Sequence, residues 1–306
     1  MRQFAALAAL ATTGAVLGAD RLSATEKGSL LIYSGAQGTI HISNDYPADV
    51  RLQSYIVNDA CESYDMAFSL TANQITAFST ESLAAPFGDG DSSVSMYVWA
   101  VNGDNAQIRW NHLSGGVIGA GAYASAAVVG DVAHGDEAGE PGFINLDGVM
   151  YSSAYNGATY NFVADADMLT IELLDHDFAD KNAADPNTKI VAEIWNENEV
   201  KFSGTARCVS CIESAGISGW SDSAVNFFRE SSLGTSLGKA RLSTEANASC
   251  GSDDNPSSER AFFASSAGFG SVAGTGSRSA TITYELESEP EEAGKRVRKA
   301  FGLLRK

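Results

Sequence analysis

The segment from residue 189 to residue 211 has the clearest secondary-structure pattern of the chain: Lys189-Ile-Val-Ala-Glu-Ile-Trp-Asn-Glu-Asn-Glu-Val-Lys-Phe-Ser-Gly-Thr-Ala-Arg-Cys-Val-Ser-Cys211. Apolar or small residues alternate with polar ones on both sides of a polar link at 196–199. Because successive side chains of a β-strand point to opposite faces, this period of two predicts an antiparallel hairpin with one buried and one wet face. The positions that share one face are Ile190, Ala192 and Ile194 in the first strand and Val200, Phe202, Gly204, Ala206 and Cys208 in the second.

Similar short runs recur along the chain at intervals of about ten residues, a spacing typical of β-sandwiches. Asn102-Gly103 follows one of them directly and predicts a tight hairpin, because both turn positions favour a positive φ. Residues 115–135 are dominated by Gly, Ala and Val and fit either a closely packed strand or a buried loop. The predicted strands are 29–34, 38–43, 50–57, 66–70, 75–79, 94–101, 108–110, 143–146, 159–163, 168–173 and 279–286.

These patterns predict an all-β protein with minor α content, built as one antiparallel β-sandwich or as two packed β-sandwich domains. We expect a β-sandwich domain at 20–180, and a second β-rich domain, or a continuation of the first, at 181–286. The acidic, polar loop at 175–187 is the expected internal boundary. Ser221 or Asp222 could cap a short helix at 221–230.

The balance of charge argues against one class of partner. The 306 residues are 44% hydrophobic and 19% charged, and they carry a formal net charge of -18. Such an acidic surface repels phosphate backbones, so the composition disfavours nucleic-acid binding. The same acidity keeps an extracellular protein soluble.

The first 19 residues have the three parts of an export signal. Arg2 supplies positive charge, an apolar alanine-rich run follows at 4–17, and the small residues Gly18 and Ala19 precede a polar start. No run of the sequence reaches the length of a comfortable membrane span. We therefore expect a signal peptide at 1–19 and a secreted protein, extracellular or periplasmic, that does not span a membrane.

The cysteines fit an oxidising compartment, because their even number permits full pairing. Four cysteines allow three connectivities, and a bond from Cys208 or Cys211 to Cys250 is the one we favour. Cys208-Val-Ser-Cys211 could instead be a redox pair, but it follows an antiparallel hairpin rather than opening a helix of a βαβ unit. A zinc site would need a second close pair, whereas Cys61 and Cys250 are isolated.

Candidate binding residues come from aromatic and acidic stretches. Tyr97, Trp99 and Trp110 surround one predicted hairpin and could form a platform that stacks on sugars, although core packing is the more common use of such residues. Asp175 and Asp177 could hold a cation such as calcium weakly. No acidic run, including 89–91 and 253–255, has the spacing of a complete calcium loop, so we expect no tightly bound cofactor.

No catalytic motif is readable. Four histidines are scattered along the chain, so a catalytic triad would have to be assembled from distant residues. Gly119-Ala-Gly121-Ala-Tyr-Ala124 matches a loose dinucleotide-binding pattern, but it lacks the alternation of strands and long helices that this fold requires.

The last 20 residues, 287–306, form a charge-segregated tail in which acids precede bases. Val297, Phe301 and Leu304 would share one stripe of a helix, so the tail could contact an anionic surface, whereas the simpler reading is a frayed terminus. Its basic candidates for surface interaction are Lys295, Arg296, Arg298 and Lys299.

Several runs resemble a group of secreted bacterial β-rich proteins to which no activity is assigned. The resemblance covers about residues 27–284 and implies a bacterial exported protein, with no site residues to carry over. The runs that carry it are Lys27-Gly-Ser-Leu-Leu-Ile-Tyr33, Ile42-Ser-Asn-Asp-Tyr-Pro47, Trp99-Ala-Val-Asn-Gly103, Ile108-Arg-Trp-Asn-His-Leu113, Asn145-Leu-Asp-Gly-Val-Met-Tyr151 and Trp195-Asn-Glu-Asn-Glu-Val-Lys-Phe-Ser-Gly204.

Two functional hypotheses follow. The first is a structural or interaction protein of the cell envelope that associates with itself or with envelope components through exposed strand edges. The second is an extracellular carbohydrate-binding module or a glycoside-directed enzyme that uses the aromatic and acidic loops. The lack of a readable catalytic motif favours the first.

Overall fold

A computed structural model describes residues 22–23, 27–88, 90–126, 133–134, 144–146, 149–151, 157–180, 186–245, 250 and 262–267, and the observations below concern these residues. Their structure is predominantly antiparallel β-sheet with few short helices, which confirms the predicted fold class. The predicted signal peptide, the predicted strand at 279–286, the acidic run at 253–255 and the basic tail residues Lys295, Arg296, Arg298 and Lys299 lie outside the described residues.

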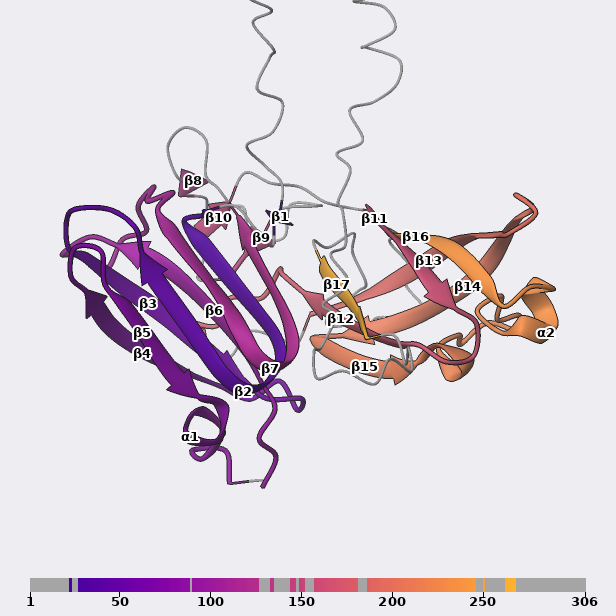
Figure 1. The fold of residues 1–306 in the computed structure, drawn as a ribbon, viewed down its shortest axis with the longest axis horizontal. Helices are drawn as coiled ribbons and strands as arrows, with labels where there is room; N and C mark the ends of the chain where they lie inside the picture. Colours follow the sequence, from indigo (N-terminus) through magenta and orange to yellow (C-terminus); the bar gives the residue numbers. More distant parts are fainter. Residues whose placement is uncertain are drawn as a thin grey trace, which may run out of the picture.

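The strands form two groups that lie side by side, as Figure 1 shows. The first group comprises β1 (Leu22–Ser23), β2 (Leu30–Asn44), β3 (Val50–Val57), β4 (Ser63–Leu70), β5 (Ile75–Ser79), α1 (Thr80–Ala84), β6 (Val94–Val101) and β7 (Leu113–Ala126). The second comprises β11 (Gly157–Val163), β12 (Met168–Leu173), β13 (Asn187–Asn196), β14 (Lys201–Ser210), β15 (Ile212–Gly216), the 3-10 turn η1 (Ile217–Gly219), α2 (Glu230–Leu233), β16 (Leu237–Glu245) and β17 (Phe262–Ala267). Between them in sequence, β8 (Ala133–His134), β9 (Ile144–Asn145) and β10 (Val149–Tyr151) form a small sheet.

The first group is built on two long paired strands, β2 and β7. Near Gly35 and Gly38 the register of β2 shifts against both of its neighbours, and the first half of β2 pairs with β6 while the second half pairs with β5. Glycines at this point have positive φ values, namely Gly35, Gly38, Gly119 and Gly121. Bulges of this kind bend strands and let them pass from one sheet layer to another. The bend encloses a core of aliphatic side chains from β2, β3 and β6 beneath β4, β5 and α1.

The second group is a sandwich of two sheets. One sheet has the order β11-β16-β13-β14, and the other has the order β15-β12-β17. Because β11 and β12 pair with β16, β15 and β17, the loop at 175–187 that the sequence suggested as a domain boundary lies inside this group, between β12 and β13. The change from one group to the other falls earlier, before β11.

The hairpin of β13 and β14 confirms the predicted pairing, but one half of its predicted face is wrong. Ala192 pairs with Thr205 and Ile194 with Phe202, so β14 has one extra residue at Gly204, whose φ is +107°. A single extra residue reverses the side-chain alternation that follows it. Thr205 is therefore fully buried, whereas Cys208 is exposed.

The predicted helix at 221–230 is displaced to α2, which begins at Glu230. Polar side chains hold the preceding segment in turns instead. Ser221 Oγ donates to the Val225 carbonyl at 2.8 Å, and Asn226 Nδ2 donates to the Ile217 carbonyl at 2.9 Å. Such local bonds compete with the hydrogen bonds of a helix.

The two groups share one continuous hydrophobic core. All eight residues of β6 are buried, because one face of β6 lies on the first core and the other faces the second group. Phe178, from the loop after β12, stacks on Tyr55 and Tyr97 at 5.5 and 5.4 Å between ring centroids. We call this region, with Glu172 of β12, the junction.

The four cysteines form two disulfides. Cys208 is bonded to Cys250, which confirms the expected bridge to Cys250. Cys61 is bonded to Cys211 across 150 residues of sequence, and this bond links the turn after β3 to the segment between β14 and β15. The Cys61–Cys211 disulfide therefore joins the two groups of strands covalently at the junction.

Candidate functional site

The three aromatic residues proposed as a sugar platform do not lie together at the surface. Tyr97 and Trp99 are buried in the junction, with exposed fractions of 1% and 0%. Trp110 lies in another place and packs against the first core. The sequence signal was ambiguous because both faces of β6 are covered, so aromatic residues alternate there with aliphatic ones on two buried faces.

Trp110 belongs to a cluster at the turn between β2 and β3. Tyr46 stacks on His112 at 4.3 Å between ring centroids and meets Trp110 edge-on at 5.0 Å. Buried Asn44 fixes the turn by accepting from Trp110 Nε1 at 3.1 Å and donating to the Ala48 carbonyl at 2.7 Å. Tyr46 remains 39% exposed, but these contacts are mutual and define no binding cleft.

Asp175 and Asp177, the pair that could have held a cation, take part in contacts within their own segment. Asp175 is buried, and the carboxylate of Asp177 accepts from the amide of Ala179 at 2.9 Å, which stabilises the turn after β12. Across the described residues, no group of three or more His, Cys, Asp or Glu side chains is placed to hold a metal ion. The same part of the chain contains no helix long and apolar enough to cross a membrane.

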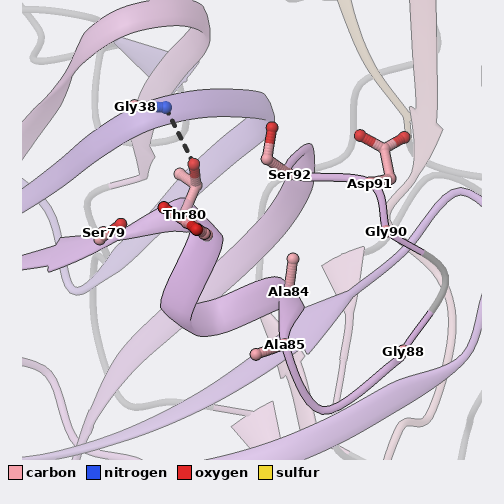
Figure 2. Close-up of a pocket in the computed structure, with 10 residues that line it drawn as sticks. Gly38, Ser79, Thr80, Ala84, Ala85, Gly88, Gly90, Asp91 and Ser92 are labelled. Carbon is pink, nitrogen blue, oxygen red and sulfur yellow. Dashed lines mark hydrogen bonds between the residues drawn. The ribbon is translucent and has the colours of Figure 1, made fainter.

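A pocket of about 690 Å³ lies between α1, the bend of β2 and the segment Gly88–Ser92. Figure 2 shows the Thr80 hydroxyl directed at the Gly38 amide, which donates to it at 2.9 Å and so ties α1 to the bend. The described residues that line the pocket are Gly38, Ser79, Thr80, Glu81, Ala84, Ala85, Gly88, Gly90, Asp91 and Ser92.

The chemistry of this pocket is limited. The lining side chains offer hydroxyls and two carboxylates, and none of the ten described ones is a histidine, cysteine or aromatic ring. A nucleophile therefore has no adjacent base, and a sugar has no ring to stack on. The pocket fits hydrogen bonding to a small polar group better than it fits catalysis.

The most unusual surface is the outer face of the sheet formed by β5, the second half of β2 and the first half of β7. Strand register places Ser79, Thr39 and Ile118 side by side in one row, and Ile75, Ser43 and Ser114 in another. Because side chains alternate between faces, these rows and the row between them face outward. The members of this uncharged face are Ile75, Ala77, Ser79, Thr39, His41, Ser43, Ser114, Gly116 and Ile118.

This face contains no acidic or basic residue other than His41, although the chain has 38 acidic and 20 basic side chains. Two large apolar residues stand out on it, because Ile75 is 63% exposed and Ile118 is 67% exposed. The remaining members are small, and the His41 ring lies against Gly116. The face is therefore apolar at two corners and uncharged.

One edge of this face is open. The Asn44 amide donates to the Gln74 carbonyl at 2.9 Å. Residues 44 and 74 are therefore a hydrogen-bonded pair of β2 and β5, and the register makes residues 42 and 76, and residues 40 and 78, the next such pairs. The backbone groups of Ile75, Ala77 and Ser79 consequently point away from β2. No described strand pairs with that edge.

Two other edge strands, β4 and β14, carry features that discourage pairing. Exposed Asp65 lies on β4. β14 is bulged at Gly204, and its later residues are covered because Asp222 accepts from the Cys208 amide at 2.9 Å. β5 has neither a charge nor a bulge.

Charges are confined to the rim of the uncharged face. Asp45 accepts from Ser43 Oγ at 2.7 Å and pairs with Lys27 at 3.1 Å. The hydrogen bond from Ser43, followed by that from Lys27, holds the pKa of Asp45 below its ordinary value, so this carboxylate stays ionised beside the apolar surface. An apolar centre with a charged rim is the usual anatomy of a protein interface.

The alternation of 38–43 indicated which of its residues face outward, whereas 75–79 was predicted only as a short strand, and the third strand of the face falls in the Gly-, Ala- and Val-rich stretch that fitted either a strand or a buried loop. No protein-family model, curated protein or solved structure matches this chain.

Proposed function

We propose that this protein is an extracellular interaction protein that associates with a second copy of itself through the uncharged face, beside the open edge of β5. The proposal rests on one observation: an uncharged face with two exposed isoleucines adjoins a strand edge that no described strand pairs, on a chain of net charge -18.

The distribution of charge favours a second copy of the chain as the partner and the uncharged face as the surface that binds it. Two chains of charge -18 repel each other wherever acidic surfaces meet. Approach through the uncharged face brings no pair of like charges together, and it buries Ile75 and Ile118 of both copies. Packing of the two faces against each other can be two-fold symmetric, and it leaves the outward backbone groups of β5 free for another partner.

Secretion is part of the proposal. The two disulfides fit an oxidising compartment, and the resemblance to secreted bacterial proteins agrees with it. In the cell envelope or outside the cell, self-association would build a larger assembly from a stable β scaffold. Envelope components remain a further class of partner for the same edge.

Replacing Ile75 and Ile118 together by lysine should weaken self-association roughly ten-fold or more, because two copies would then place four positive charges in one desolvated contact. Sedimentation velocity over a concentration series measures this effect. Val200→Lys is the matched control, because Val200 is 49% exposed in the turn between β13 and β14 and should leave association unchanged. A wild-type protein that stays monomeric up to millimolar concentration, or a double variant that associates like the wild type, would refute the proposal.

A further inference from the structure

The junction contains a buried carboxyl group that connects the two groups of strands. Glu172 lies on β12, on the side of the second group that faces the first (Figure 1), and its side chain is fully buried. Ser95 Oγ donates a hydrogen bond to Oε1, and Tyr97 OH donates one of 3.1 Å to Oε2. Both donors belong to β6, so a single carboxyl group joins β12 to the first sheet.

Among the described residues, the surroundings of Glu172 offer hydroxyls but no positive charge. Asp59, in the turn after β3, adds a negative charge, and the strand neighbours of Glu172 on β15 and β17 are the apolar Ile212 and Phe263. Glu213, next on β15, is engaged by Arg207. Asp175 and His176 follow in the loop after β12, and each has a partner of its own.

Burial is the main cause of an altered acidity here. It raises the pKa of Glu172 to about 7, and Asp59 adds to the rise. The hydroxyls of Ser95, Ser34 and Tyr97 oppose it, in that order. Ser34 acts through its proximity, because its hydroxyl does not reach hydrogen-bonding geometry.

We infer that the junction is a pH-sensitive contact: it accommodates Glu172 between β12 and β6 as a neutral group, whereas ionisation of this fully buried carboxyl group, which no described positive charge compensates, loosens the two groups of strands. The Cys61–Cys211 disulfide would keep the groups linked when the contact loosens. Phe178, which stacks on the neighbouring rings of Tyr55 and Tyr97, would then be the first aromatic contact to separate.

The direction of the effect follows from proton linkage. Glutamate has an ordinary pKa of 4.5, which applies to the unfolded chain, and the folded value is about 7. Below pH 4.5 both states are protonated, and the contact contributes its full stability. As the pH rises from 4.5 through 7, the unfolded chain releases the proton first, so this stability is progressively lost.

Urea unfolding of the wild type and of Glu172→Gln from pH 5 to pH 8 tests the inference. Gln keeps the size of the side chain and cannot ionise. The unfolding equilibrium constant of the wild type should rise relative to that of the variant on the order of 50-fold over this range. Glu197→Gln, at an exposed position in the turn between β13 and β14, is the matched control and should follow the wild type.

A second readout separates local opening from a general loss of stability. Hydrogen-exchange protection, corrected for the intrinsic effect of pH, should fall with rising pH in β6 and β12 before it falls in β13 and β16. Parallel unfolding curves for the wild type and Glu172→Gln, or an equal loss of protection in all four strands, would overturn the inference. If Glu172→Gln does not fold, the carbon-13 resonance of the wild-type carboxyl group decides: a midpoint near 7 supports the inference, and one near 4.5 overturns it.

Discussion

Replacing Cys61 and Cys211 together by serine should lower the free energy of unfolding by up to about 5 kcal/mol. The bond closes a loop of 150 residues, and the entropy that a cross-link removes from the unfolded chain grows with the length of its loop. The bond also lies at the junction, where Cys211 is 5% exposed and Cys61 packs against the shared core. Chemical denaturation of the wild type and the double variant, each at equilibrium, measures the loss.

The other disulfide is the natural control. Cys208–Cys250 closes a loop of 42 residues, for which the same relation gives about 4 kcal/mol. Its Cys208 end is exposed on the outer side of β14, away from the shared core. We therefore expect the double serine variant of Cys208 and Cys250 to be the more stable of the two. The reverse order would contradict a covalent role for Cys61–Cys211 in joining the two groups of strands.

Gly119→Ala should destabilise the protein by about 3 kcal/mol or more. Gly119 lies at the bend of β7 with a φ of +136°, and a methyl group there would stand 2.0 Å from the backbone oxygen of Gln37. The Gln37 oxygen and the backbone of Gly119 belong to paired strands, so neither can move without breaking the bend. Thermal and urea unfolding of the purified variant give the size of the effect, and failure to accumulate folded protein is its limiting case.

Gly103→Ala is the matched control for this prediction. A methyl group at Gly103 meets no atom within 4 Å, and its φ is not in the positive range. Its effect should stay within about 0.5 kcal/mol. Equal stability of Gly119→Ala and Gly103→Ala would mean that the bend shared by β2 and β7 does not form as described.

The same glycine shows the limit of the hairpin signal at Asn102-Gly103. The turn that forms there is longer, because Asn102 donates its amide to the Ala106 carbonyl at 2.8 Å and the positive φ falls on Asn105. The side chain of Asn102 accepts from the amides of Asp104 and Ala106 and so closes a wider loop. The sequence predicted the position of the turn, but the side-chain hydrogen bonds of Asn102 determine its length and conformation.

Alternation predicted most of the strands, because one buried and one wet face leave a period of two in the sequence. Alternation gave the wrong face where a bulge interrupts the period of two, and it gave no answer where both faces of a strand are buried. The extra residue at Gly204 reversed the faces of β14; a glycine inside a strand often marks a bulge, but the alternation was extended through it as if the strand were continuous. Core packing was the more common expectation for Trp99, and Trp99 is buried, but because β6 is covered on both faces its sequence did not show that Trp99 lies in the junction.

The candidate surfaces were harder to predict because each depends on contacts between distant residues. The uncharged face combines three strands whose members lie between residues 39 and 118, and only their register shows that no charge falls among them. Glu172 looks like an ordinary wet position of β12 in sequence, next to Ile171. Its burial becomes visible only when β6 covers it from the other group.

Chemical cross-linking at Ala77 tests the proposed self-association most directly. Ala77 is an exposed residue at the centre of β5, with its backbone groups toward the open edge. Ala67 is an exposed alanine on β4 and provides a matched position on a different edge strand. With a short bis-maleimide reagent, Ala77→Cys should give covalent dimers of the folded protein while Ala67→Cys stays monomeric. Dimers in equal yield from both variants, or none from Ala77→Cys, would contradict association through β5.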